Sequence, residues 1–284
     1  MDTKRVVTAF AIGLPALFAI IAGGLWLAIL VSIIVFFAAK EYTEILRNKG
    51  FLPSLKIILT SSVLFAFLAF FNRFNLIPLA FTLSTIIAFM WVLFRGRQPY
   101  IANVATTLLG FVYCGWFPLH LLFLRNMGGD IEGWFIPSPI GAGYCLLILF
   151  AVLVTDTFCY IVGCKWGKNK LSPVISPNKT IEGSFGGSIM CMIFSIGIGF
   201  LINLPWYHSV VLGFLIAVFA QIGDLCESMI KRDAGVKDSS NVLPGHGGFL
   251  DRTDSYIFTI PVVYYYLQYF VNSSYLTDLI KGLF

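Results

Sequence analysis

Charge is what this sequence has least of. Only 12% of its 284 residues are charged, whereas 58% are hydrophobic, and the mean hydropathy is +0.86. A soluble domain carries about 25% charged residues. The shortage of charge excludes an ordinary water-soluble domain, and the long apolar runs predict an all-α, polytopic integral membrane protein.

Histidine and paired cysteine are also scarce. The three histidines are scattered, and none of the six cysteines forms a CxxC pair. We therefore expect neither a zinc site nor a disulfide framework, and interpret the cysteines as small buried side chains. A P-loop is missing as well, because no GxxxxGK[ST] motif is present. We expect no nucleic-acid partner.

The apolar runs predict nine membrane-spanning helices. The run 6–39 is too long for one span of about 20 residues, so two helices should meet at Gly23-Gly24, followed by a charged loop over 40–56. Each of seven further runs is expected to form one span. They are 57–71, 76–94, 101–124, 140–162, 184–203, 209–230 and 255–271.

Positive charge predicts the orientation. If nine spans alternate, sixteen of the nineteen lysines and arginines fall on the side of the N-terminus, which the positive-inside rule makes cytoplasmic. The C-terminus should then face outside. The apolar run after Lys4 and Arg5 exceeds the roughly 7–15 residues of a signal-peptide core, so we expect a retained first span. The short polar N-terminus favours a bacterial cytoplasmic (inner) membrane.

Acidic residues divide the chain functionally. The first five predicted spans contain none, whereas the last four contain Asp156, Asp224 and Glu227. We therefore predict a scaffold of helices over 1–139, with dimer or lipid contacts as candidate roles. The catalytic region should cover 140–284 and carry two cytoplasmic polar loops, 163–187 and 231–254.

The most polar segment is 221–254, QIGDLCESMIKRDAGVKDSSNVLPGHGGFLDRTD, which holds six of the fourteen acidic residues. At 100° per residue, a helix places Asp224, Glu227, Ser228 and Lys231 on one face. A structural Asp224–Lys231 pair is the alternative, but such a pair needs no Glu, Ser and Gln beside it. Charge at membrane depth marks a functional site by default.

Carboxylates from three predicted spans should lie at one depth near the cytoplasmic rim. They are Asp156, Asp224, Asp251 and Asp254. Oxygen ligands suit Mg²⁺, which is typically held by one or two carboxylates plus substrate phosphates. We predict Asp224 and Asp251 as metal ligands, with Asp156 as a further candidate. The spacing leaves one or two divalent ions open, as it does a second, monovalent cation.

Two loops carry residues suited to phosphate. In 243–254, Gly247 and Gly248 allow close backbone approach beside His246, and Arg252 offers a guanidinium fork. An ordinary glycine-rich turn is the alternative there.

In the other loop, Lys179, Thr180 and Glu182 precede a glycine-containing helix start, which also suits phosphate. Lysines that only enforce topology or touch anionic membrane lipids are the alternative.

With these residues laid out, 228–254 resembles the signature of the phosphatidate cytidylyltransferase (CDP-diacylglycerol synthase) family, S-x-x-K-R-x4-K-D-x4-(L/I/F)-P-x-H-G-G-x-x-D-R-x-D. The matching residues are Ser228, Lys231, Arg232, Lys237, Asp238, Leu243, Pro244, His246, Gly247, Gly248, Asp251, Arg252 and Asp254. Upstream, Asp156, Gly163, Gly167 and the run from Lys179 to Gly183 also resemble the family. The first 100 residues resemble it only in hydropathy.

The resemblance implies transfer of CMP from CTP to phosphatidic acid, giving CDP-diacylglycerol and pyrophosphate, with Mg²⁺. It is also compatible with a homodimer. The catalytic residues expected are Asp224, Ser228, Lys231, Arg232, Asp251 and Asp254. The substrate- or phosphate-binding residues expected are Lys179, Thr180, Glu182, Lys237, Asp238, His246, Gly247, Gly248 and Arg252.

Two other functions compete with this interpretation. Another lipid-phosphate or lipid-alcohol transferase would suit the same location, although the D-G-x2-A-R pattern of CDP-alcohol phosphotransferases is absent. A cation-coupled transporter would use intramembrane carboxylates, but it predicts an inverted repeat and a midplane site. The sequence has no repeat, and its acids cluster at the predicted cytoplasmic end.

Overall fold

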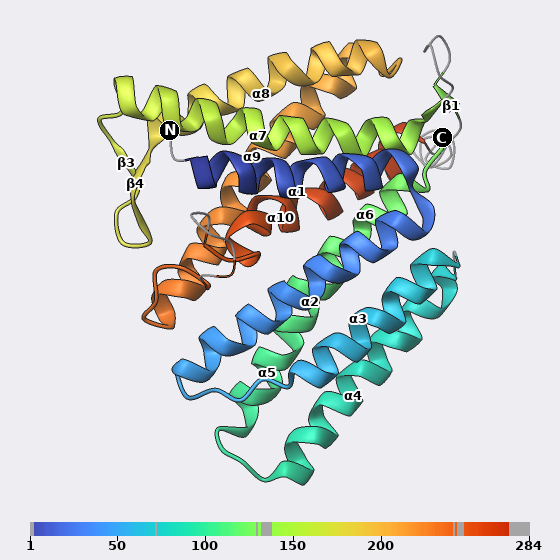
Figure 1. The fold of residues 1–284 in the computed structure, drawn as a ribbon, viewed down its shortest axis with the longest axis vertical. Helices are drawn as coiled ribbons and strands as arrows, with labels where there is room; N and C mark the ends of the chain where they lie inside the picture. Colours follow the sequence, from blue (N-terminus) through green and yellow to red (C-terminus); the bar gives the residue numbers. More distant parts are fainter. Residues whose placement is uncertain are drawn as a thin grey trace, which may run out of the picture. The chain divides into compact units, whose positions relative to one another are not determined.

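The computed structural model describes residues 3–71, 73–128, 130–131, 138–240, 242 and 247–272, and it is mostly helical. Among these residues, six helices are long and apolar enough to cross a membrane. They are α2 (Gly24–Asn48), α4 (Ile77–Arg95), the continuous helix Tyr100–Arg125, α7 (Ile140–Trp166), α8 (Ile181–Leu201) and α9 (Trp206–Asp233) (Figure 1). These helices support a polytopic membrane protein, and the total of nine spans stays a prediction.

The chain folds as two compact units, each built from two stretches of sequence. The first contains the described residues of Met1–Leu122 and Cys226–Ile257, and the second those of Phe123–Leu225 and Phe258–Phe284. The predicted division into scaffold and catalytic region concerns function and stays a prediction.

The first unit begins with α1 (Thr3–Ala22) and α2. As predicted, the helix is interrupted at the glycine pair, where Gly23 and Gly24 have φ of 66° and 50°. The predicted loop over 40–56 is wrong in its first half, because α2 continues to Asn48. The charges there occupy mainly the exposed face, whereas Tyr42 and Ile45 lie on the buried face.

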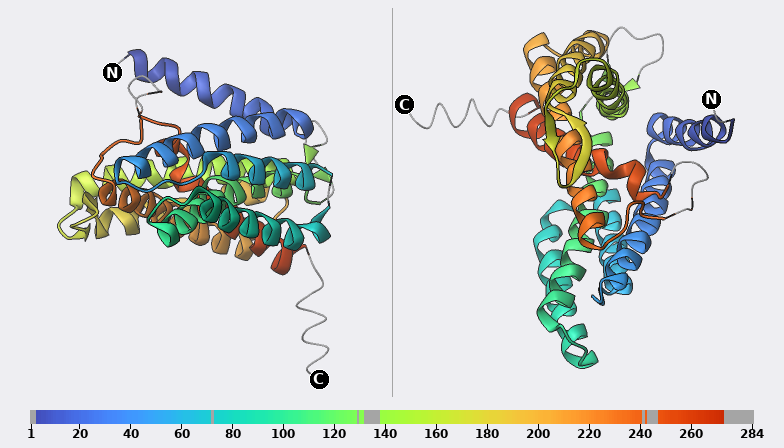
Figure 2. Two further views of the ribbon diagram at one scale, coloured as in Figure 1. Left: turned by 90° about the horizontal axis from the view of Figure 1, so that it is seen from below. Right: turned by 90° about the vertical axis from the view of Figure 1, so that its left-hand side faces the viewer.

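Four more helical segments complete the N-terminal part of this unit: α3 (Leu55–Phe70), η1 (Phe74–Leu76), α4 and the continuous helix α5 (Tyr100–Gly110), η2 (Phe111–Trp116) and α6 (Phe117–Arg125). The α3 and α4 helices lie side by side (Figure 2). Phe65 of α3 and Phe111 of the π-helical segment η2 are fully buried against each other. The Tyr42 hydroxyl donates to the Thr106 carbonyl over 2.9 Å, which ties α2 to α5.

The second unit is built on α7 and α8, which pack along each other (Figure 1). Small residues permit the close approach: a Cβ on Gly183 would lie 2.6 Å from the Cys159 carbonyl oxygen, and one on Gly187 would lie 2.9 Å from that of Thr155. The glycines at the start of α8 therefore serve helix packing.

A short antiparallel hairpin of β3 (Lys170–Ser172) and β4 (Ser176–Thr180) joins the end of α7 to the start of α8 (Figures 1 and 2). The predicted polar loop 163–187 is thus too wide, because the flanking helices reach Trp166 and Ile181. A second strand pair, β1 (Asp130–Ile131) and β2 (Ser138–Pro139), precedes α7. Neither pair was expected of an all-α chain.

The predicted loop 231–254 is also too wide. The α9 helix ends at Asp233, and α10 (Leu250–Tyr266) continues into the π-helical segment η3 (Leu267–Val271). Lys231 and Arg232 therefore lie in the last turn of α9, and Asp251 lies in the first turn of α10. Helices hold these side chains more firmly than a loop would.

Candidate active site

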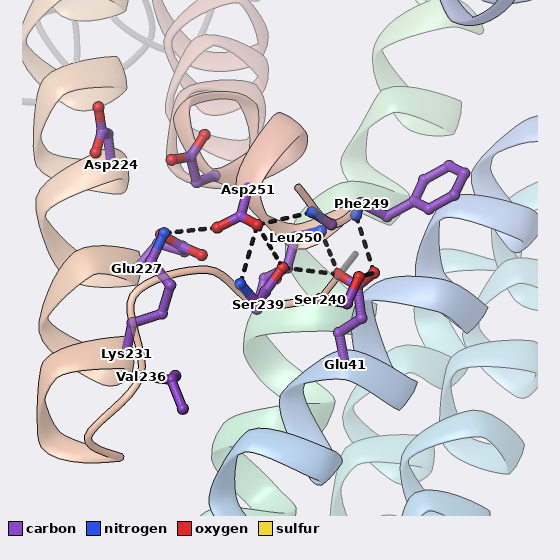
Figure 3. A network of polar contacts seen from close by, with 12 residues as sticks. Glu41, Asp224, Glu227, Lys231, Val236, Ser239, Ser240, Phe249, Leu250 and Asp251 are labelled. Atoms are coloured by element: carbon purple, nitrogen blue, oxygen red, sulfur yellow. Dashed lines mark hydrogen bonds and ion pairs between the residues drawn. The ribbon is translucent and has the colours of Figure 1, made fainter. Parts of the chain in front are cut away.

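Asp251 accepts four hydrogen bonds at the start of α10 (Figure 3). Its Oδ1 accepts from Lys231 Nζ over 2.6 Å, and its Oδ2 accepts from the Ser239 N–H, the Ser239 hydroxyl and the Gly248 N–H over 3.0, 2.7 and 2.8 Å. Burial alone would raise the pKa of Asp251, but these hydrogen bonds outweigh burial and lower the pKa to about 2. Asp251 is therefore a carboxylate at neutral pH.

Lys231 lies between two carboxylates. Besides Asp251 it forms an ion pair with Glu227, one turn earlier on α9. The side chain of Glu227 is 0% exposed and that of Lys231 is 12% exposed. A buried charge costs several kcal/mol unless it is paired, so each partner depends on the other.

The glycines of the predicted phosphate loop lie against this cluster. Gly247 has φ of 77°, in the left-handed region that favours glycine. A Cβ on Gly248 would overlap the Ser239 hydroxyl and the Glu41 carboxyl group. The sequence predicted that the backbone at these glycines approaches a ligand. In the described part of the chain, the backbone of Gly248 instead approaches the side chains of Ser239 and Glu41. His246 lies outside the described residues.

Sequence reasoning missed Ser239 and Ser240 of this cluster and, much earlier in the chain, Glu41. It lies on α2 with 2% of its surface exposed, and it accepts from the hydroxyls of Ser239 and Ser240 and from the N–H groups of Phe249 and Leu250 (Figure 3). One feature of the sequence could have pointed to Glu41: it is an acidic residue on the same face of α2 as buried apolar residues. Extending the predicted helix beyond residue 39 would have revealed it.

In the second unit, Lys179 of β4 and Asp224 of α9 form an ion pair of 2.5 Å. Both side chains are about one-third exposed, at 27% and 32%. Asp156 lies on α7 of the same unit. The structure thus brings two of the predicted site residues, Lys179 and Asp224, together as a direct pair.

Thr180 and Glu182 make contacts within the protein. The Thr180 hydroxyl caps α8 by accepting from the Gly183 N–H over 3.2 Å. The Glu182 carboxyl group accepts from the N–H groups of Lys168 and Asn169 and from the Asn169 amide. These contacts fix the hairpin to the start of α8, and the proposed phosphate-binding roles of the two residues stay predictions.

The remaining predicted residues lie at the ends of α9 and α10 or between them. Arg232, Lys237, Asp238 and Arg252 are exposed, and Ser228 and Asp254 are half-buried. Asp254 Oδ1 accepts from the Ser255 N–H over 2.7 Å. The exposed cations are accessible to phosphate groups from outside the protein.

The residues present fit a divalent cation bound partly by substrate. Over the described residues there is no cluster of three or more His, Cys, Asp or Glu side chains that could hold a metal ion. Mg²⁺ does not need one, because it is usually bound through one or two carboxylates plus phosphates and water. Asp251 and Asp224 each already bind a cation, the ammonium group of Lys231 or of Lys179. Their oxygen atoms are the ligand type that Mg²⁺ prefers.

Within the described ranges of the chain, six helices are long and apolar enough to cross a membrane, and carboxylates paired with lysines and exposed arginines lie on or beside them. These features are compatible with the class of membrane proteins that handle phosphate groups. The chain belongs to the cytidylyltransferase family, whose model matches residues 3–270. It is 35% identical over 290 residues to the phosphatidate cytidylyltransferase of Synechocystis sp., covering 94% of this chain and 97% of that protein. The proteins of the same name from Bacillus subtilis (30% over 276 residues, 94% and 98% covered) and Staphylococcus saprophyticus (34% over 268 residues, 92% and 96% covered) are similar.

Proposed function

We propose that this membrane protein is a phosphatidate cytidylyltransferase, which transfers CMP from CTP to phosphatidic acid and releases pyrophosphate. The observation that carries the proposal is the similarity to enzymes of this name over more than 90% of the chain. The cluster of Asp251 and Lys231, which are both signature residues, supports it.

The reaction is an in-line displacement at phosphorus. A phosphate oxygen of phosphatidic acid attacks the α-phosphorus of CTP. The bond between the α-phosphorus and the oxygen that bridges the α- and β-phosphates breaks, and pyrophosphate leaves with that oxygen. A dianionic phosphate is already a competent nucleophile, so no general base is needed. Lys231, Arg232 and Arg252 are the cations assigned to hold the phosphates in line, since guanidinium and ammonium groups bind phosphate oxygens and orientation lowers the barrier. Lys179 of the second unit is a further phosphate-binding candidate.

We assign Asp224 and Asp251 as the carboxylates that would hold Mg²⁺, with Asp156 as a further candidate. A bound ion would neutralise charge on the phosphates and on the leaving pyrophosphate. One or two divalent ions, or a divalent and a monovalent ion, are compatible with these carboxylates. Mg²⁺ titration of purified protein tests the assignment: activity without any divalent ion would contradict it.

The first test is the choice of nucleotide. Purified protein with labelled phosphatidic acid and Mg²⁺ should give a CMP-lipid and pyrophosphate with CTP, and at most trace product with ATP, GTP or UTP. Reactions lacking phosphatidic acid, or containing EDTA, are the controls. No nucleotide transfer from any triphosphate would reject the proposal and favour the cation-coupled transporter. Transfer of a phosphate group to a lipid alcohol would instead favour the lipid-alcohol transferase.

The proposed site faces the cytoplasm of a bacterial inner membrane, where CTP is available. This orientation assumes nine spans, with α1, α3 and α10–η3 added to the six long helices. Lysine-rich ends of α2, α7 and α9 then lie on one side. A homodimer stays a prediction.

Cysteine labelling tests the orientation. Cys164, at the end of α7, is exposed, whereas the other five cysteines are buried or partly buried. A membrane-impermeant maleimide should label Cys164 in inside-out vesicles and not in intact cells. Trp206→Cys in a Cys164→Ser background is the matched control, because the exposed start of α9 should react in intact cells. The reverse pattern would invert the topology.

A further inference from the structure

Glu41 is a buried carboxyl group that hydrogen-bond donors surround on both oxygens. Oε1 accepts from the Ser240 hydroxyl over 2.6 Å and from the Phe249 N–H over 3.0 Å. Oε2 accepts from the Leu250 N–H over 2.8 Å and from the Ser239 hydroxyl over 3.1 Å. Four donors from two neighbouring segments thus converge on one side chain of α2.

Two of these donors belong to the beginning of α10. The first N–H groups of a helix have no partner within it and are normally capped by a side chain close in sequence. Here the cap for Phe249 and Leu250 comes from a residue more than 200 positions earlier, with sequence separations of 208 and 209. The position of the first turn of α10, which carries Asp251 and Arg252, is therefore set by α2.

The Ser239 hydroxyl links Glu41 to Asp251, because its single hydrogen is shared between the two carboxyl groups, with the shorter contact to Asp251. Its oxygen lies 3.1 Å from Glu41 Oε2 and 2.7 Å from Asp251 Oδ2, and Asp251 contacts Lys231 in turn (Figure 3). A continuous chain of polar contacts thus runs from α2 to α9. Among the residues that the structure describes, no predicted substrate-binding side chain is a hydrogen-bond partner of Glu41.

A purely structural role accounts poorly for this arrangement. Burying a carboxyl group costs free energy that a well-packed apolar side chain would avoid. A buried carboxyl group that positions a reactive carboxylate is retained for its effect on activity despite this cost. The hydrogen-bond partners of metal ligands are of this kind.

We propose that Glu41 is a positioning residue for the CMP-transfer reaction: it holds the first turn of α10, and through Ser239 the carboxylate of Asp251, in the reactive arrangement. The inference rests on the proposed function and adds to it a residue from the N-terminal half of the chain. Glu41 acts through Asp251 and does not itself touch the reacting atoms.

Glu41→Gln is the first test. An amide offers only one oxygen, so its NH₂ group must face the N–H of either Phe249 or Leu250, and neither can accept a hydrogen bond. We expect kcat to fall about 10-fold, the lower end of the range for losing a direct hydrogen-bond partner of a metal ligand, because Glu41 reaches Asp251 only through Ser239. The Mg²⁺ concentration for half-maximal activity should rise. The KM for CTP should change much less than kcat. Glu44→Gln, on the exposed face of the same helix and in a 4.0 Å surface pair with Lys40, is the matched control and should keep wild-type activity.

A pair of serine variants separates positioning from packing. Ser239 and Ser240 are neighbours, and both donate to Glu41, but only Ser239 also contacts Asp251. Ser239→Ala should therefore lower kcat and raise the Mg²⁺ requirement far more than Ser240→Ala does. Equal effects of the two variants would contradict a path through Ser239.

Hydrogen–deuterium exchange gives a readout that needs neither metal nor activity. In Glu41→Gln without Mg²⁺, amides of the peptide 247–254 should exchange faster than in wild type, while peptides from α7 and α8 stay unchanged. Faster exchange throughout the protein would mean general destabilisation and would reject the inference, as would wild-type exchange and activity in Glu41→Gln. If wild type itself transfers no CMP, the proposed function fails, whereas the exchange experiment still tests the coupling of Glu41 to α10.

Discussion

Asp251→Asn should abolish Mg²⁺-dependent CMP transfer, with kcat reduced by more than about 100-fold, the upper end for losing only a hydrogen-bond partner of a metal ligand. The reason lies in the four donors around this carboxylate. In one orientation the asparagine NH₂ faces the Lys231 ammonium, and in the other it faces the N–H groups of Ser239 and Gly248. The variant therefore loses the negative charge, and in either orientation its NH₂ group faces another hydrogen-bond donor, with which it cannot form a hydrogen bond.

The measurement is pyrophosphate release from CTP and phosphatidic acid by purified protein across a Mg²⁺ titration. Asp224→Asn should show a loss of the same order. Asp233→Asn is the matched control, because Asp233 is 65% exposed and forms only a 3.6 Å surface pair with Lys49. Near-normal turnover in either Asp251→Asn or Asp224→Asn would overturn the assignment of that residue as a metal ligand.

Lys231→Gln should lose both activity and stability. Removing the ammonium leaves Glu227 buried without its cation, and breaking a buried pair on one side costs about 3–5 kcal/mol. The same change removes a cation proposed to hold substrate phosphates, so CMP transfer should fall to background. Thermal unfolding in detergent and the pyrophosphate assay measure the two losses separately.

The double variant Glu227→Gln/Lys231→Gln separates stability from catalysis. It removes both buried charges, so much of the lost stability should return while activity stays at background. Lys49→Gln, which breaks a surface pair, should leave both close to wild type. A double variant that regains activity would show that Lys231 serves only to neutralise Glu227.

The class of this protein was predictable from sequence, because long apolar runs combined with scarce charge are typical of membrane-spanning helices. The break at Gly23-Gly24 was predictable too, since only glycine adopts such backbone angles readily. Helix periodicity and the depth of the predicted spans selected Asp224, Lys231 and Asp251 as candidates, and their roles stay predictions. The structure pairs Asp224 with Lys179 and Asp251 with Lys231.

The partners of these residues were less predictable. Helix periodicity relates positions three or four apart, so it suggested an Asp224–Lys231 pair and carried no information on contacts such as that between Glu41 and Ser239. Helix ends were misplaced for a related reason. Charged residues at 40–48 and at 231–233 were interpreted as loop. A membrane helix can continue past the apolar core when its charges are exposed or, like Glu41 and Lys231, are hydrogen-bonded or paired within the protein.

The distance along the chain between Glu41 and its partners has a consequence for biosynthesis. The Ser239 hydroxyl lies 198 positions after Glu41, and at about 5–20 residues per second the ribosome needs roughly 10–40 s to add that many residues. During this interval α2 has already been made, while every donor that will surround Glu41 is still missing. A carboxyl group that waits so long must remain in contact with water or lipid headgroups, so Glu41 reaches its final burial only when the segment from Ser239 to Leu250 has been synthesised.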